Sequence, residues 1–246
     1  MRTVTTDGRE GFAPVEGSTP VDDATRMTHV PRMCRLPGVY APQTDTGLLA
    51  AHVRRERLRP GARSLDLCTG TGAVAVVAAR HGARATAVDI SRSAITVARL
   101  NALLHRCSIR VLRGDLDAPV PHERFDLVTV NPPYVPCEDA EAPARGARRS
   151  WDAGTDGRLL LDRVCARAPR LLTPSGVLLL VQSSLSGVDA TLEALGRRGL
   201  AARVVERRTE TFGPVMSARS DWFAAQGLIA PGARTEELVV IRACRP

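Results

Sequence analysis

Apolar and polar positions follow two alternating periods along most of the chain. Short apolar runs typical of strands occupy residues 64–68, 83–90, 108–112, 125–130, 176–181, 201–205 and 237–243. Apolar residues recur at helical spacing in residues 46–59, 73–80, 91–105, 160–171 and 188–198. Alternation of this kind predicts an α/β fold with a mostly parallel seven-stranded sheet and helices on both faces. Residues 210–235 are interpreted as an insertion in an antiparallel hairpin of the last two strands.

The same pattern predicts how the chain is divided. Residues 1–35 are rich in Thr, Gly, Pro and Asp and lack apolar periodicity, which predicts a flexible N-terminal tail. Residues 36–246 are predicted to form one catalytic domain, since 246 residues fit one α/β domain better than two. No apolar run approaches the roughly 18 residues that span a membrane, and the N-terminus resembles no secretory signal, so we expect a cytoplasmic protein without membrane insertion.

The composition of the chain says little about which partners it binds. The net charge of +8 is compatible with nucleic acid or another acidic partner. All 34 cationic side chains are arginine, however, as a GC-rich genome produces whatever the function. The six cysteines form no CxxC pair and the five histidines no paired motif, so reduced thiols are expected and no metal site is predicted.

The first candidate site residues lie in the loop of residues 66–72, DLCTGTG. Its glycines permit a tight turn and a close backbone approach to a ligand at a helix N-terminus. With Ala75 the loop also matches GxGxxA, so a nicotinamide or flavin cofactor stays open on this motif alone. Asp66 would repel a pyrophosphate but suit an ammonium and a sulfonium, which favours S-adenosyl-L-methionine. The alternative is that Asp66 only caps the following turn.

Two further carboxylates follow the next two strands. Asp89 can accept hydrogen bonds from both ribose hydroxyls, or can serve only as a favourable charge at a helix N-terminus. Asp115 can accept from an adenine amine, with the Leu116 backbone N–H donating to the ring edge. A simple Gly-Asp turn is the alternative at that position.

The segment of residues 131–134, Asn-Pro-Pro-Tyr, follows the fourth predicted strand and is called here the acceptor shelf. Its two prolines fix φ and carry no N–H, which makes the segment rigid. The side-chain oxygen of Asn131 and the carbonyl of Pro132 can then accept both protons of a planar NH2 group beside the Tyr134 ring. Such a nitrogen is a poor nucleophile, and two preorganised acceptors would stabilise its developing positive charge. A plain Pro-Pro turn is the less specific alternative.

These motifs together resemble the class I methyltransferases that modify glutamine in peptide-chain release factors, and more distantly the N6-adenine DNA methyltransferases. The resemblance covers about residues 39–246 and is nearest to the short branch without an N-terminal helical domain. It implies a Rossmann-like methyltransferase fold and, as cofactor-binding residues, Thr46, Asp66, Cys68, Gly70, Gly72, Asp89, Asp115, Leu116 and Asn131. Asn131, Pro132 and Tyr134 are implied as catalytic residues.

The resemblance also extends to residues 151–163, which in the short branch lie beside the substrate pocket. The family usually has glycine where this chain has Cys68, and that departure puts a side chain near the methionine part of the cofactor. Some members in other lineages require a small zinc-containing activator subunit, and nothing in the sequence decides whether this chain has such a partner.

Four functions remain open. The favoured one is methylation of the glutamine N5 atom in the Gly-Gly-Gln loop of release factors. N6-adenine methylation of DNA or RNA is the runner-up, although duplex DNA would require base flipping and no target-recognition domain is evident. A cofactor-binding protein without catalysis is disfavoured by the intact acceptor shelf. Methylation of a small-molecule amine is the fourth.

Overall fold

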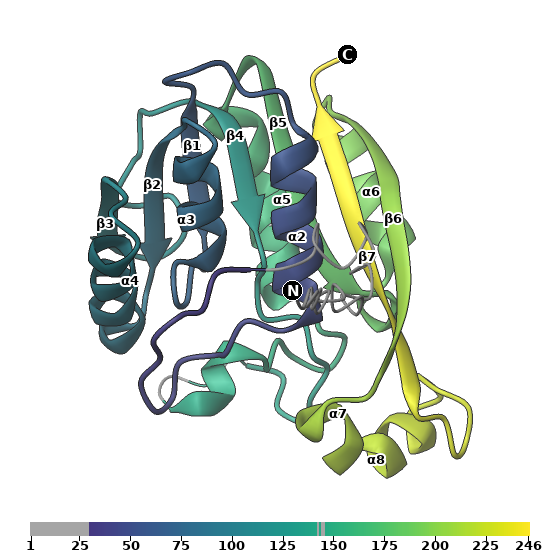
Figure 1. Ribbon diagram of the computed structural model, residues 1–246. Coiled ribbons are helices and arrows are strands. Elements are labelled where there is room, and N and C mark those ends of the chain that lie inside the picture. The colour runs from purple at the N-terminus through teal and green to yellow at the C-terminus, as the bar shows by residue number, and fades with distance from the viewer. Residues whose placement is uncertain (1–29, 142, 144–145) are drawn as a thin grey trace, which may run out of the picture.

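The computed structural model describes residues 30–141, 143 and 146–246, and its centre is one seven-stranded sheet (Figure 1). The strand order is β3-β2-β1-β4-β5-β7-β6. The first five of these strands are parallel, and β7 runs antiparallel to both β5 and β6. The strands are β1 (Arg63–Leu67), β2 (Arg84–Asp89), β3 (Ile109–Arg113), β4 (Phe125–Val130), β5 (Leu172–Ser183), β6 (Ala201–Thr211) and β7 (Thr235–Cys244).

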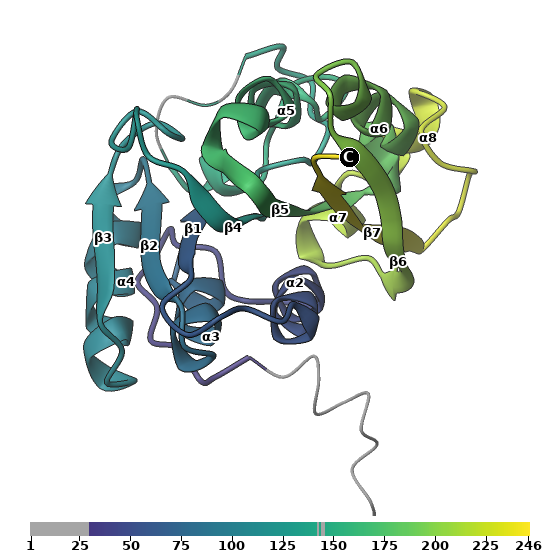
Figure 2. The ribbon, with the colours of Figure 1, turned by 90° about the horizontal axis from the view of Figure 1, so that it is seen from above.

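Helices cover both faces of this sheet, as the view from above shows (Figure 2). One face carries α2 (Thr44–Arg55), α3 (Ala73–Arg80) and α4 (Arg92–Leu104). The other face carries α5 (Leu159–Leu171) and α6 (Val188–Gly196). Two short helices, α7 (Pro214–Ala218) and α8 (Ser220–Ala225), lie between β6 and β7 in the sequence.

The central strands are apolar because both of their faces are covered. Leu178, Leu179 and Leu180 of β5 are fully buried although successive side chains of a strand point to opposite faces. Leu127 and Val128 of β4 are buried in the same way. At the sheet edge, β6 has no fully buried stretch, which agrees with its charged sequence. The core therefore lies around β1, β4 and β5, whose ends carry the site described below.

The predicted fold class is confirmed, and the predicted strand at residues 125–130 and helix at 73–80 have the observed bounds. Ser91 caps α4, since its hydroxyl accepts from the Ala94 N–H at 3.4 Å. Three predicted boundaries differ from the structure by about four residues or more. The first helix ends at Arg55, β5 begins four residues early at Leu172, and β6 continues to Thr211 instead of ending near residue 205.

Cys34 contacts α4 before the predicted start of the catalytic domain. The Asn101 side chain accepts from the Cys34 N–H at 2.8 Å and donates to the Cys34 carbonyl at 2.9 Å. The same amide donates to the Thr71 carbonyl at 2.9 Å, so one buried side chain joins the N-terminal segment to the glycine-rich loop. The predicted tail lies mostly outside the described residues. Within the described part, no helix is long and apolar enough to cross a membrane.

Candidate active site

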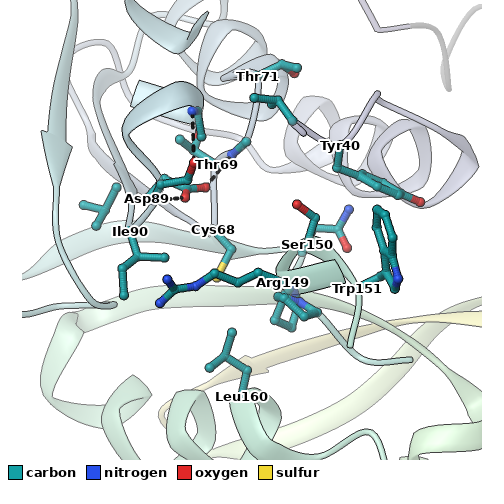
Figure 3. Close-up of a pocket in the computed structure, with 18 of the residues that line it drawn as sticks. Tyr40, Cys68, Thr69, Thr71, Asp89, Ile90, Arg149, Ser150, Trp151 and Leu160 are labelled. Carbon is teal, nitrogen blue, oxygen red and sulfur yellow. Dashed lines mark hydrogen bonds between the residues drawn. The ribbon is translucent and has the colours of Figure 1, made fainter. Parts of the chain in front are cut away.

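A cavity of about 870 Å³ lies at the carboxyl ends of the parallel strands. This is where ligands bind in open α/β sheets, because the loops after neighbouring strands meet there. Every residue predicted for the site lines this cavity except Gly72. Figure 3 shows Asp89 and Ile90 at one end and Tyr40 and Trp151 at the other.

Asp89 and the glycine-rich loop hold each other in place. The Asp89 carboxylate accepts from the backbone N–H groups of Gly70 and Ser91, both at 2.9 Å. Gly72 has φ of +82°, and a Cβ there would lie 3.2 Å from the Ala98 Cβ of α4. Gly72 therefore serves the turn and the close approach of α3 to α4 rather than the cavity wall.

Asp66 has its carboxylate engaged within the protein. Its two oxygens accept from the Thr69 hydroxyl and, at 2.7 Å, from the Thr129 hydroxyl. Burial raises the pKa of Asp66 to about 6, although these hydrogen bonds oppose the shift. Asp66 thus caps the loop, as the alternative interpretation proposed, and also lines the cavity.

Cys68 stands between the carboxylates in an unusual backbone conformation. Its φ of +55° is one that non-glycine residues seldom adopt. Burial first, and then the charges of Asp89 and Asp66, raise the pKa of its thiol well above the usual value. Cys68 is accordingly a neutral thiol that narrows the cavity.

Arginines approach the same end of the cavity. In Figure 3 the Arg149 side chain extends into it on the side of Asp89 and Ile90. Burial raises the pKa of Asp89, and the charge of Arg149 partly opposes this shift. The predicted adenine contact Asp115 forms a salt bridge with Arg163 of α5. The sequence motif alone gave no signal for that pairing, because the partners are 48 residues apart.

Asn131, on the acceptor shelf, is oriented by residues of α2. Its side-chain nitrogen donates to the Thr46 hydroxyl at 3.4 Å, and that hydroxyl donates to Asp45 at 3.1 Å. Because the amide nitrogen points at Thr46, the amide oxygen is turned away from it and is available as an acceptor. Thr46, predicted as a cofactor contact, thus also positions the predicted catalytic amide.

Tyr134 is held at its hydroxyl and at its carbonyl. Its hydroxyl donates to Asp45 at 3.1 Å, and Tyr40 donates to the same carboxylate oxygen at 3.4 Å. Its carbonyl accepts from the Ser186 hydroxyl at 2.6 Å. Burial, with the nearby Asp45 charge, raises the pKa of Tyr134 well above the usual value, so the phenol stays neutral. Asp45 and Ser186 were not predicted from the sequence.

Comparison with known proteins agrees with this geometry. Residues 31–145 match the family model described as a methyltransferase small domain. A Methanocaldococcus jannaschii protein named "Putative protein N5-glutamine methyltransferase" is 32% identical over 181 residues, which cover 73% of this chain and 90% of that protein. The release factor glutamine methyltransferase of Geobacter sulfurreducens is 32% identical over 66% of this chain.

A third relative acts on a small molecule. The 4-amino-L-phenylalanine/4-methylamino-L-phenylalanine methyltransferase of Streptomyces pristinaespiralis is 35% identical over 65% of this chain. The chain spans 59% of the Geobacter protein, 60% of the Streptomyces protein and 39% of a further curated relative.

A solved structure shares the fold. A chain of the E. cuniculi Mtq2-Trm112 complex has a TM-score of 0.59 and 23% identity, over 85% of this chain and 99% of that chain. The M. jannaschii relative is matched over 90% of its length. This chain belongs to the family of protein N5-glutamine methyltransferases.

Proposed function

We propose that this enzyme uses S-adenosylmethionine to methylate the side-chain amide of the glutamine in the Gly-Gly-Gln loop of a peptide-chain release factor, in the cytoplasm. The observation that carries the proposal is the acceptor shelf beside a carboxylate-lined cavity, with the Asn131 amide oriented by Thr46. The name of the Geobacter relative supports the choice of substrate.

The cavity suits the proposed cofactor. Its volume of about 870 Å³ falls in the range of small-molecule sites. Arginines also line the cavity, and Asp115 is paired with Arg163. At the glycine-rich loop, however, the carboxylates of Asp66 and Asp89 suit an ammonium and a sulfonium better than a pyrophosphate. Asp89 accepts two backbone hydrogen bonds and keeps further lone pairs for a ribose diol. Asp66, Cys68 and Asp115 would contact the rest of the molecule.

The acceptor shelf would hold the reacting nitrogen. When bound, the cofactor supplies the methyl group as an electrophile. Asn131 Oδ1 and the Pro132 carbonyl would each accept one hydrogen bond from the planar NH2 group. These two hydrogen bonds would align the nitrogen lone pair and stabilise its growing positive charge. As the nitrogen forms its bond to the methyl carbon, the methyl–sulfur bond would break and its electron pair would go to sulfur, and the methylated nitrogen would then release one proton to solvent. Tyr134 supports the face of the group and stays uncharged.

This arrangement discriminates by hydrogen bonding. An acid or an alcohol would leave one of the two acceptors unpaired, at a cost of about 1 to 3 kcal/mol. Glycines beside the glutamine leave room for it to enter, since no neighbouring side chain blocks the approach.

A second acceptor is favoured by one specific observation. The Streptomyces relative is named for methylation of an aromatic amine, and an aniline NH2 is also planar enough to donate to both acceptors. Tyr40 and Trp151 lie at the end of the cavity where such a ring would enter (Figure 3). The N6-adenine alternative uses the same acceptor shelf and is kept as an outcome of the test.

The test offers the three acceptors side by side. Recombinant release factor, 4-amino-L-phenylalanine and adenine-containing nucleic acid are each incubated with enzyme and labelled S-adenosylmethionine. Mass spectrometry should find one added methyl on the Gly-Gly-Gln peptide, and Asn131→Ala should slow its appearance by about two to three orders of magnitude. Labelling of the aromatic amine or of adenine, with none on the release factor, would assign the function to that acceptor instead.

A further inference from the structure

We propose that the segment between β6 and β7, residues 212–234, controls the acceptor end of the active site through Arg219. Arg219 is a positioning residue that sets the affinity for the acceptor, and this role rests on the proposed function. Arg219 lies between α7 and α8, in the segment that the sequence analysis left as an insertion.

The acceptor end has a wall made of two backbone segments, residues 135–137 and 151–154, called here the acceptor wall. Val135 and Asp152 form a parallel β-bridge. The Val135 N–H donates to the Trp151 carbonyl at 2.8 Å, and the Cys137 N–H donates to the Gly154 carbonyl at 2.9 Å. Val135 directly follows the acceptor shelf, so the wall and the shelf move together.

A buried charge lies in this wall. The Asp152 side chain is fully buried, and a buried carboxylate is stable only when it is paired. Two arginines pair with it: Arg148 at 2.7 Å and Arg219 at 2.6 Å. The Arg148 side chain is 53% exposed, whereas that of Arg219 is 21% exposed. Solvent therefore screens the Arg148 contact more, and Arg219 is the stronger partner.

Arg219 also reaches the other segment of the wall. The nitrogen that bonds Asp152 donates to the Pro136 carbonyl at 3.3 Å. One guanidinium group thus connects residues 135–137 with residues 151–154 from outside the cavity. Arg148, the other arginine that pairs with Asp152, has Asp139 as its second partner and so does not join the two segments in this way.

The insertion is packed firmly enough to hold Arg219. Phe212, Met216 and Phe223 are all buried, and the Phe223 N–H donates to the Arg219 carbonyl at 2.9 Å. Figure 1 shows α7 and α8 at the same end of the sheet as the carboxyl ends of the parallel strands. The insertion is therefore a second support for the acceptor wall, independent of the strands that carry Asp66 and Asp89.

The consequence is a separation of two binding steps. Loss of Arg219 leaves Asp152 buried with a solvent-exposed partner, so the acceptor wall shifts. The cofactor end is held by the Gly70 and Ser91 contacts of Asp89, which Arg219 does not touch. We expect Arg219→Ala to raise the KM for the release factor about tenfold or more, while the Kd for S-adenosylmethionine stays within about twofold.

Three variants make the experiment specific. Arg219→Lys keeps a cation with several N–H donors on one nitrogen, but on a side chain of different length, and it should recover part of the KM. Arg219→Ala combined with Asp152→Asn removes the unpaired charge and should be less impaired than Arg219→Ala alone. Arg197→Ala removes an exposed arginine whose partner is Glu193 on α6, and it should change neither constant.

Hydrogen exchange gives a readout that needs no acceptor. In Arg219→Ala, peptides spanning residues 134–137 and 151–154 should exchange faster, while the peptide of residues 66–75 should not. The inference is overturned if these wall peptides keep their protection, or if the cofactor Kd rises by the same factor as the acceptor KM. If wild-type enzyme fails to methylate the release factor, the proposed function fails, and the exchange pattern still decides the role of Arg219. If Arg219→Ala does not fold, the same hydrogen-exchange and binding measurements are made on Arg219→Lys, and the same outcomes decide.

Discussion

Asp66 is a carboxylate whose protonation changes close to neutral pH. Its pKa of about 6 lies above the usual 3.8, so the folded protein binds more protons than the unfolded chain between these values. For this group, stability therefore increases as the pH falls from about 6 toward 3.8. Ligand binding should have the opposite dependence, because a bound cation favours the ionised form.

We expect the affinity for S-adenosylmethionine to fall as the pH decreases below about 6, and to be nearly constant above pH 7. Titration calorimetry in two buffers of different ionisation enthalpy should detect proton release on binding near pH 6. Asp66→Asn should remove both effects, and the demethylated product, which lacks the sulfonium charge, should show a weaker dependence. A pH-independent affinity would show that the cation does not sense Asp66.

Cys68 carries a backbone cost that glycine would avoid. Its φ of +55° costs roughly 1 to 2 kcal/mol for a residue with a Cβ. Cys68→Gly removes that cost, but glycine loses more conformational entropy on folding, which costs about 0.5 to 1 kcal/mol. The two effects oppose each other, so the free energy of unfolding should change little. Cys68→Val should be clearly destabilised, because branched side chains fit this conformation worst.

Denaturant unfolding of Cys68→Val is compared with that of Cys107→Val, whose parent cysteine is also half-buried but lacks a positive φ. Equal destabilisation of the two valine variants would refute the backbone explanation.

Candidate site residues could be predicted from the sequence where they lie next to one another in the chain. Asn131, Pro132 and Tyr134 form one motif, and Asp89 follows directly from the end of a strand. Asp45 was not predicted, because its contact with Tyr134 joins residues 89 positions apart. The thiol at Cys68 was predicted to alter the cavity, but its positive φ was not.

At the scale of the elements, Gly157 keeps the turn before α5 against the acceptor shelf. It has φ of +71°, and a Cβ there would lie 2.3 Å from the Tyr134 carbonyl oxygen. Both partners are backbone, so neither can rotate away. Gly157→Ala should therefore displace Tyr134 and lower kcat by about tenfold or more. The strain of a Cβ at this φ should also lower the free energy of unfolding by about 1 to 3 kcal/mol.

Gly199→Ala is the matched control for this change. Gly199 has φ of +78° with nothing within 4 Å of its Cβ position, so it reports the backbone strain alone. The positive φ should lower the free energy of unfolding of both variants by a similar amount. Only Gly157→Ala should lose activity, which is measured by steady-state kinetics at saturating cofactor. Equal activity in both would mean that the Tyr134 carbonyl is not held where the structure places it.

Elements with strong periodicity were predictable, and elements set by long-range pairing were not. The strand at residues 125–130 carries the apolar residues Phe125, Leu127, Val128 and Val130, a run that the sequence shows directly. The second half of β6 is charged and exposed, and its ladder with β7 makes it a strand. The helices α7 and α8 are only five and six residues long, too short for a helical period to be recognised.

The whole molecule places the two proposed ends of the site, one for the cofactor and one for the acceptor, at one edge of the sheet. The cofactor end depends on β1, β2 and the glycine-rich loop, while the acceptor end depends on the acceptor shelf, α2 and the β6–β7 insertion. The order of strands was not derivable from periodicity, but the carboxyl-end position of the candidate residues was, because parallel strands direct their following loops to the same edge.

The central claim is that Asn131 acts on the transferring group and not on cofactor binding. Single-turnover methyl transfer to the release factor, at saturating S-adenosylmethionine, tests this most directly in Asn131→Ala, with Asp89→Ala as the reverse control. We predict that Asn131→Ala lowers the rate by about two to three orders of magnitude with an unchanged cofactor Kd, whereas Asp89→Ala first weakens the Kd. A near-wild-type rate in Asn131→Ala would contradict the account.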